Sequence, residues 1–159
     1  MSKLSPPLIF LDFDGVLHPA QGSEVRDFAF APHLARAVQD VHCEVVISST
    51  WREHYPLPEL KRLLPEPLAA LVVGTLGADQ PGPHVRYKTI CRWLVEHRAT
   101  DRRWCAVDDN GSEFPAGMRE LLLCDGMRGF GAWEAECLRD WLLRDTSFSQ
   151  QSGDRGLAG

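Results

Sequence analysis

The stretch that most constrains the fold is Leu8–His18, in which a short apolar run is followed at once by acidic residues and a glycine. The run, which ends at Leu11, is typical of a strand buried on both faces of a parallel sheet. Asp12 and Asp14 come next, and a buried carboxylate is costly unless it is paired or bound to a cation. Ligands of open α/β sheets bind at this end of a strand. The pair therefore predicts a functional site, the alternative for each aspartate being a helix cap or an Asx-turn before Gly15.

Strand-like and helix-like segments alternate along the rest of the chain. This alternation predicts an α/β fold of three layers, Rossmann-like, with a central parallel sheet of about five strands and helices on both faces. Strands are expected in the run from residue 8, after residue 44, and at Leu68–Val73, Arg103–Val107 and Glu120–Cys124. Helices are expected at Pro32–Asp40, at Pro58–Leu64, from Lys88 onward, and at Trp133–Leu143.

Length and composition indicate one compact unit. The 159 residues carry a formal net charge of −5, and a single domain is expected over residues 1–145. Residues 146–159 are poor in apolar side chains and are expected to be a disordered tail. The five cysteines include no CxxC pair, so reduced thiols are expected and a zinc site is not. Residues 1–7 are too short and polar for a secretion signal, and no run of about twenty apolar residues exists, so a cytoplasmic protein without a membrane span is expected.

Polar residues follow two further strands. Ser48 comes directly after an apolar run, and its hydroxyl can donate to a phosphoryl oxygen without adding charge. Ser49 takes this role if the strand ends one residue later, and the alternative for both, and for Thr50, is a helix cap. Asp108 and Asp109 close the fourth strand, where they would repel each other unless a cation lay between them and the first aspartate pair. Such hard oxygen ligands suit Mg²⁺.

A basic residue precedes the fourth strand. Lys88 stands where a helix is expected to begin, although the positive end of the helix dipole disfavours a cation there. A bound phosphoryl group and nearby aspartates would offset that cost. Arg86 is the competing candidate, and an ordinary exposed lysine is the alternative reading.

The segment Asp12–Leu17 resembles the first motif of the haloacid dehalogenase (HAD) superfamily, which consists largely of Mg²⁺-dependent phosphatases with an aspartate nucleophile. Ser48, Lys88 and the pair Asp108-Asp109 match the family's second, third and fourth motifs, in the right order. The resemblance covers the chain from about residue 8 to residue 125 and implies the HAD fold. It implies the type without a cap domain, because the gaps at 17–32 and 52–87 leave no room for one.

The resemblance also implies a mechanism. Asp12 would attack phosphorus and become an aspartyl-phosphate, and Asp14 would protonate the leaving oxygen and later activate water. Mg²⁺ would be held by Asp12, the main-chain carbonyl of Asp14 and Asp108, with help from Asp109. Two residues would hold the phosphoryl oxygens, namely Ser48 and Lys88.

The substrate is expected to be large, because HAD enzymes without a cap have an open site. Arg52 could grip a phosphate and Trp51 could stack on a base; the alternatives are a core position for Trp51 and an ion pair for Arg52. These residues are similar to those of small HAD domains associated with RNA-repair proteins, so a nucleic-acid 3′ or 5′ phosphate end or a phosphoprotein is the expected substrate. His18 is expected to be a turn residue. A regulatory module that binds a partner without catalysis is the second hypothesis, and dehalogenase or phosphomutase chemistry is a third, which Asp14 disfavours in its dehalogenase form.

Overall fold

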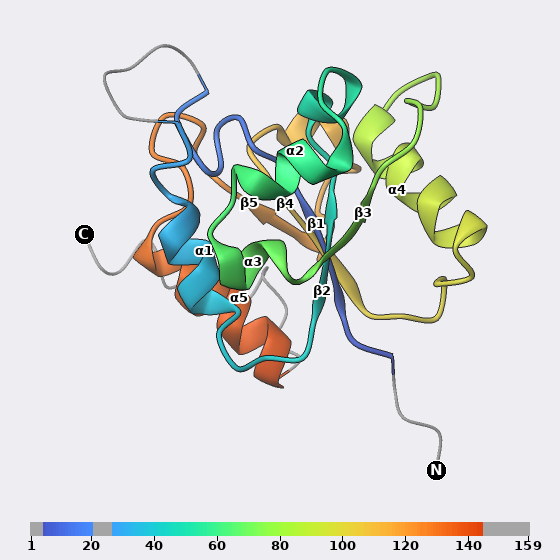
Figure 1. Ribbon diagram of the computed structural model, residues 1–159. Coiled ribbons are helices and arrows are strands. Elements are labelled where there is room, and N and C mark those ends of the chain that lie inside the picture. The colour runs from blue at the N-terminus through green and yellow to red at the C-terminus, as the bar shows by residue number, and fades with distance from the viewer. Residues whose placement is uncertain (1–4, 21–26, 145–159) are drawn as a thin grey trace.

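The computed structural model of the protein, which describes residues 5–20 and 27–144, is built on a parallel sheet of five strands in the order β3-β2-β1-β4-β5 (Figure 1). This architecture confirms the predicted α/β class. The strands are β1 (Leu8–Leu11), β2 (Glu44–Ile47), β3 (Val72–Thr75), β4 (Trp104–Asp108) and β5 (Leu121–Leu123).

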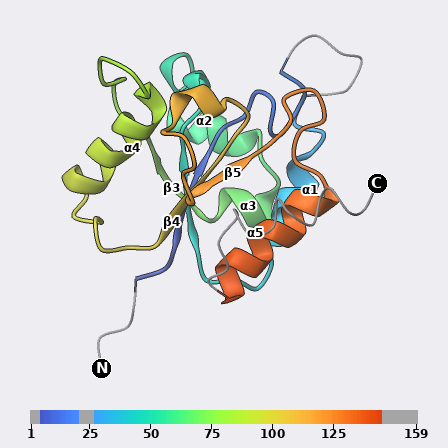
Figure 2. The ribbon, with the colours of Figure 1, turned by 180° about the vertical axis from the view of Figure 1, so that it is seen from behind.

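Helices cover both faces of the sheet. In Figures 1 and 2, α1 and α5 lie together on one side and α4 lies on the other. The helices are α1 (Ala31–Ala37), α2 (Leu57–Arg62), α3 (Glu66–Ala69), α4 (Val85–Glu96) and α5 (Ala132–Arg144), with 3₁₀ turns η1 (Thr50–Glu53) and η2 (Gly111–Glu113).

The central strand β1 is completely buried, which explains why its sequence is a continuous apolar run. Ile9 and Leu11 join the core that includes residues of α1 and α5. Leu8 and Phe10 point to the other face, where the Phe10 ring meets Trp93 of α4 edge-on at 5.5 Å between ring centroids. The two cores fix β1 from both sides, so the residues that follow it have a well-defined position.

The strand order reverses direction at β1. The chain proceeds from β1 to β2 and β3 on one side, and then crosses to β4 and β5 on the other. In open α/β sheets the crevice at such a switch point, outside the carboxyl ends of the strands, is where ligands bind. The loops after β1 and β4 therefore face each other at the place where the sequence puts its aspartates.

Among the element boundaries that differ from the sequence prediction, the starts of β3 and α4 differ by three residues or more. The segment expected to be a strand at Leu68–Val73 instead contains the end of α3, which Pro65 precedes, and β3 begins only at Val72. Proline is favoured in the first turn of a helix, and α3 carries one there. Helix α4 begins at Val85, three residues before Lys88.

The segments between the motifs build the sheet rather than a cap. From Thr50 to Thr75 the chain forms η1, α2, α3 and strand β3. No cap domain is evident in the described residues, as the sequence predicts. The tail predicted at residues 146–159 lies outside the described residues.

Two further expectations concern the whole chain. The five cysteines all lie in described segments and form no disulfide. Across residues 5–20 and 27–144, no helix has both the length and the apolar character needed to cross a bilayer.

Candidate active site

The three central strands end side by side. Leu11 is paired with the last residue of β2 on one side and with Val107 on the other. The next residues in register are Asp12, Ser48 and Asp108. Backbone hydrogen bonds hold this edge together, since the Asp12 amide donates to the Val107 carbonyl at 3.0 Å and the Ser48 amide to the Leu11 carbonyl at 2.8 Å.

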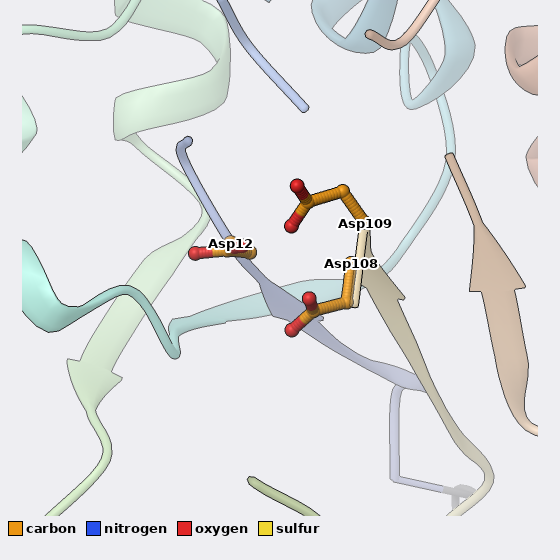
Figure 3. Close-up of side chains that lie close together, drawn as sticks. All are labelled: Asp12, Asp108 and Asp109. Carbon is orange, nitrogen blue, oxygen red and sulfur yellow. The ribbon is translucent and has the colours of Figure 1, made fainter. Parts of the chain in front are cut away.

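Three carboxylates meet at this edge and form what we call the acidic cluster, composed of Asp12, Asp108 and Asp109. One oxygen from each lies within 4.8 Å of the others (Figure 3). Asp12 is only 6% exposed and Asp108 only 2%. Like charges this close and this buried require a compensating cation or a bound proton.

The donor set fits a divalent cation. Asp108 Oδ2 is buried and has no hydrogen-bond partner among the described residues. Its ion-pair partner, Arg86 Nε, lies 3.4 Å away and is likewise buried without a hydrogen bond. A buried carboxylate oxygen without a partner beside two further carboxylates is the kind of hard ligand set that Mg²⁺ takes.

A cavity of about 390 Å³ opens over the acidic cluster. Its walls carry six carboxylates against one guanidinium, that of Arg86, so a phosphate dianion would be repelled unless a cation were bound. The lining residues are Asp12, Asp14, Thr50, Asp79, Val85, Arg86, Asp108, Asp109, Asn110 and Glu113.

Burial and mutual repulsion raise the pKa values of the two most buried carboxyls. Burial raises the pKa of Asp12 to about 8, Asp108 adds to the rise, and Arg86 partly offsets it. Burial likewise raises the pKa of Asp108 to about 6, while Arg86 acts in the opposite direction. Without a cation the fold therefore favours protonated carboxyls here, and a cation would favour the ionised forms.

Mg²⁺ is expected to raise the melting temperature, and to do so more at about pH 8 than at about pH 5. Since the folded-state pKa values are raised, the metal-free protein loses stability as pH rises from the ordinary carboxyl range toward the values of Asp12 and Asp108. At low pH, protons compete with the metal for the same oxygens. Thermal melts with and without Mg²⁺ test this, and Asp108→Asn should abolish most of the increase. An increase independent of pH, or unchanged in that variant, would contradict the assignment.

Two glycines make room for Asp109. Gly15 has a φ of +76°, and a Cβ there would lie 2.1 Å from Asp109 Oδ2. A Cβ on Gly126 would lie 2.8 Å from the same oxygen. The glycine after Asp14 thus provides both the left-handed turn and the space that lets Asp109 join the cluster.

Gly15→Ala is expected to cost more stability than Gly117→Ala and to abolish the Mg²⁺ response. Both positions are left-handed, at φ +76° and +72°, so each alanine carries a strain of about 1–2 kcal/mol. Only at Gly15 would the added methyl also displace Asp109, because nothing lies within 4 Å of a Cβ on Gly117. Equal destabilisation of the two variants in chemical denaturation, with an unchanged Mg²⁺ response, would show that the space beside Gly15 is not needed to place Asp109.

Asp14 lines the cavity beside the acidic cluster and is held by two ring N–H groups. His18 Nε2 lies 2.6 Å from Asp14 Oδ1. Trp51 Nε1 lies 3.3 Å from Oδ1 and 3.2 Å from Oδ2. The sequence suggested base stacking for Trp51 and a turn role for His18; the structure places both side chains against Asp14. The sequence offered no signal for this contact, because residues 14 and 51 are brought together only by the sheet.

Arg52 lies outside the cavity. Nε and Nη2 donate to the Gly77 carbonyl, Nη1 to the carbonyls of Ser48 and Ser49, and Nη2 also to Asp79 Oδ1 at 2.7 Å. Its side chain is 4% exposed. These contacts account for all five guanidinium N–H groups, so none is left for the phosphate that the sequence suggested. Arg52 instead connects η1 with Gly77 and Asp79 in the loop between β3 and α4.

The three hydroxyl residues after β2 have different surroundings. Ser48 and Ser49 are buried, and Ser49 Oγ accepts from the Trp51 amide as the N-cap of η1. Ser48 stands next to Asp12 in the register of the sheet. Thr50, considered from the sequence only as a cap, lines the cavity.

Arg86, rather than Lys88, reaches the acidic cluster. The Lys88 amide already donates to the His84 carbonyl, which places Lys88 one turn inside α4. Its ammonium lies 3.4 Å from the Pro81 carbonyl and lines a different hollow. Arg86 lies in the first turn, where its amide donates to Glu113 Oε2 at 3.0 Å and its side chain faces Asp108.

One protein family matches most of the chain. Its model, described as the HAD domain in Swiss Army Knife RNA repair proteins, aligns with residues 8–135. This range includes β1, the acidic cluster and the start of α5. No curated protein and no solved structure matches the chain.

Proposed function

The chain belongs to the family of HAD domains in Swiss Army Knife RNA repair proteins, and from this we propose that it is a Mg²⁺-dependent phosphomonoesterase acting on phosphorylated nucleic-acid ends. The observation that carries the proposal is the acidic cluster beside Asp14 in one cavity. A module that only binds a partner would have no use for buried carboxylates that repel one another at a strand edge.

Asp12 is the nucleophile. One of its carboxylate oxygens attacks phosphorus, the bond from phosphorus to the ester oxygen breaks, and an aspartyl-phosphate forms. Asp14, in its acid form, transfers its proton to the departing ester oxygen, which leaves as an alcohol.

Asp14 then serves as the base. Its carboxylate takes a proton from the water that attacks phosphorus, the bond between phosphorus and the Asp12 oxygen breaks, and inorganic phosphate leaves. Asp12 is regenerated as a carboxylate and Asp14 as an acid, so the cycle closes without a further reactant.

The phosphoryl oxygens need compensation for their charge. Asp12, the Asp14 carbonyl and Asp108, with help from Asp109, would hold Mg²⁺, whose positive charge would neutralise the phosphoryl oxygens and favour ionised Asp12. The hydroxyls of Ser48, which directly follows β2, and of Thr50, which begins η1 and lines the cavity, provide neutral donors. Arg86 takes the role of the basic residue, because its guanidinium faces the cavity and the Lys88 ammonium does not.

A large substrate suits the shape of the site. No cap domain stands over the cavity in the described residues, so a polymer end can approach. The family description names RNA repair proteins, and repair of a broken strand requires ends with the correct phosphorylation state. A 3′ or 5′ terminal phosphate of an oligonucleotide is therefore the proposed substrate.

A substrate panel tests this proposal. Phosphate release with Mg²⁺ should be measured on oligoribonucleotides carrying a 3′ or a 5′ phosphate, on glucose 6-phosphate and on a phosphoserine peptide. We expect kcat/KM for one of the oligonucleotides to exceed the others by about 100-fold, the scale of a few good contacts. Activity confined to the sugar phosphate or the peptide would overturn the nucleic-acid assignment, and no activity on any ester would overturn the phosphatase.

A further inference from the structure

The contacts around Asp14 distinguish its two oxygens. Oδ1 lies near two donors, at 2.6 Å from His18 Nε2 and 3.3 Å from Trp51 Nε1, whereas Oδ2 lies near Trp51 Nε1 alone, at 3.2 Å. A carboxyl oxygen has two lone pairs. The His18 ring nitrogen therefore occupies one position on Oδ1, the single Trp51 N–H is shared between the two oxygens, and Oδ2 keeps one open position.

The tautomer of His18 follows from its other partner. The Phe28 amide donates to His18 Nδ1 at 3.3 Å, so Nδ1 is the acceptor and the ring hydrogen is on Nε2, directed at Asp14. His18 is 5% exposed and its ring meets that of Phe28 edge-on at 5.0 Å. The imidazole is thus held in one orientation from both ends.

Phe28 adopts an unusual backbone conformation where it makes this contact. Its φ is +61°, a left-handed value that is costly for a bulky side chain. At this residue the amide donates to His18, and the ring packs against both His18 and Trp51, at centroid distances of 5.0 and 5.2 Å. The strained residue thus supports the two groups that contact Asp14.

The turn itself does not need the imidazole. The Gly15 amide donates to the His18 carbonyl at 2.8 Å, and the amides of Val16 and Leu17 donate to the Phe13 carbonyl at 3.1 and 2.9 Å. These backbone bonds close the turn after β1 whatever side chain stands at position 18. The imidazole of His18 is therefore not needed to close the turn, and its short contact is with Asp14.

We propose that His18 and Trp51 are positioning residues, which hold Asp14 so that Oδ2 presents its proton to the leaving oxygen. The inference rests on the proposed phosphatase and adds to it the groups that fix the acid. Positioning groups of this kind typically act by restricting a catalytic side chain to its productive rotamer.

Leaving-group dependence tests this role. The ratio kcat/KM depends only on the steps up to departure of the leaving group. It is therefore sensitive to Asp14 acting as the acid and not to Asp14 acting later as the base. Ethyl phosphate needs protonation of its leaving oxygen, whereas 2,4-dinitrophenyl phosphate does not. Both substrates should be assayed with wild type and with His18→Leu, His18→Gln, Trp51→Phe and Asp14→Asn.

We expect His18→Leu to lose about 100-fold on ethyl phosphate and only a few-fold on the dinitrophenyl ester, the pattern that Asp14→Asn should show more strongly. His18→Gln, which can still donate an N–H, should recover part of the loss. Trp51→Phe keeps an aromatic ring against Phe13 and Phe28 but removes the N–H, so it tests the proposal even if His18→Leu does not fold. His97→Gln, at the C-cap of α4 where the histidine contacts Trp93, serves as the control.

Two outcomes would overturn the inference. Equal losses of kcat/KM on both esters would show that His18 and Trp51 support the fold of the site and do not position Asp14 as the acid. No loss on either ester would show that the two residues have no role in catalysis. An inactive wild type would instead overturn the proposed phosphatase.

Discussion

Replacing Asp12 with asparagine is expected to abolish turnover while leaving the fold intact. An amide cannot attack phosphorus, and removal of a catalytic nucleophile typically lowers kcat by about 10⁴-fold or more. The fold should tolerate the change, because asparagine has the same shape and removes a carboxyl whose pKa burial raises to about 8. At a pH above the ordinary carboxyl range, the raised pKa of Asp12 destabilises the metal-free protein relative to the unfolded chain, so the variant should melt at the same temperature or higher.

Phosphate release and thermal melts measure both parts of this prediction. Asp101→Asn, at an exposed turn before β4, is the matched control and should behave like wild type. Turnover retained by Asp12→Asn, after contaminating phosphatases have been excluded with a second independent preparation, would contradict the role of Asp12. A large fall in melting temperature would show instead that Asp12 supports the fold.

Removing Arg86 is expected to be far more harmful than removing Lys88. Arg86→Ala deletes the cation that lines the cavity, and loss of one preorganised donor to a transition state typically costs about 10²–10³ in rate. Lys88→Ala should change kcat/KM by less than about threefold, because its ammonium lies against the Pro81 carbonyl in another hollow.

Steady-state kinetics on one end-phosphorylated oligonucleotide compares the two variants directly, and each serves as the other's control. Arg86→Lys should recover part of the loss, since it keeps the charge but not the planar fork of donors. A severe defect in Lys88→Ala with a mild one in Arg86→Ala would restore Lys88 as the basic residue of the site.

The acidic cluster could be predicted from the sequence because each aspartate follows a recognisable apolar strand. Parallel strands end at one edge, so Asp12 and Asp108 had to lie close together once the fold class was known. Asp109 was predicted with them, although the space that Gly15 and Gly126 leave for it becomes visible only in three dimensions.

The start of α4 could not be predicted from the sequence in the same way. The helix is preceded by His84 in a left-handed conformation, at φ +57°, and that residue makes no side-chain cap. No serine, threonine or aspartate therefore marks the boundary. Because α4 begins three residues earlier than the sequence predicts, Arg86 and not Lys88 lies in its first turn and faces the acidic cluster.

The roles of Trp51 and Arg52 depended on partners that are distant in the sequence. Trp51 meets Asp14, 37 residues earlier, and Arg52 meets Gly77 and Asp79, 25 and 27 residues later. A sequence shows that an aromatic and a basic residue follow β2, but not whether they face the substrate or the protein. In both cases the structure shows a contact with the protein.

The residue that becomes phosphorylated during turnover identifies the nucleophile. Wild-type protein with Mg²⁺ and a ³²P-labelled end-phosphorylated oligonucleotide should be quenched in acid during turnover and then mapped by peptide. We predict a phosphate, stable in acid and labile to hydroxylamine, on the peptide that contains Asp12, and none in Asp12→Asn. Turnover with no labelled peptide, or with the label on another residue, would contradict the claim that Asp12 attacks phosphorus.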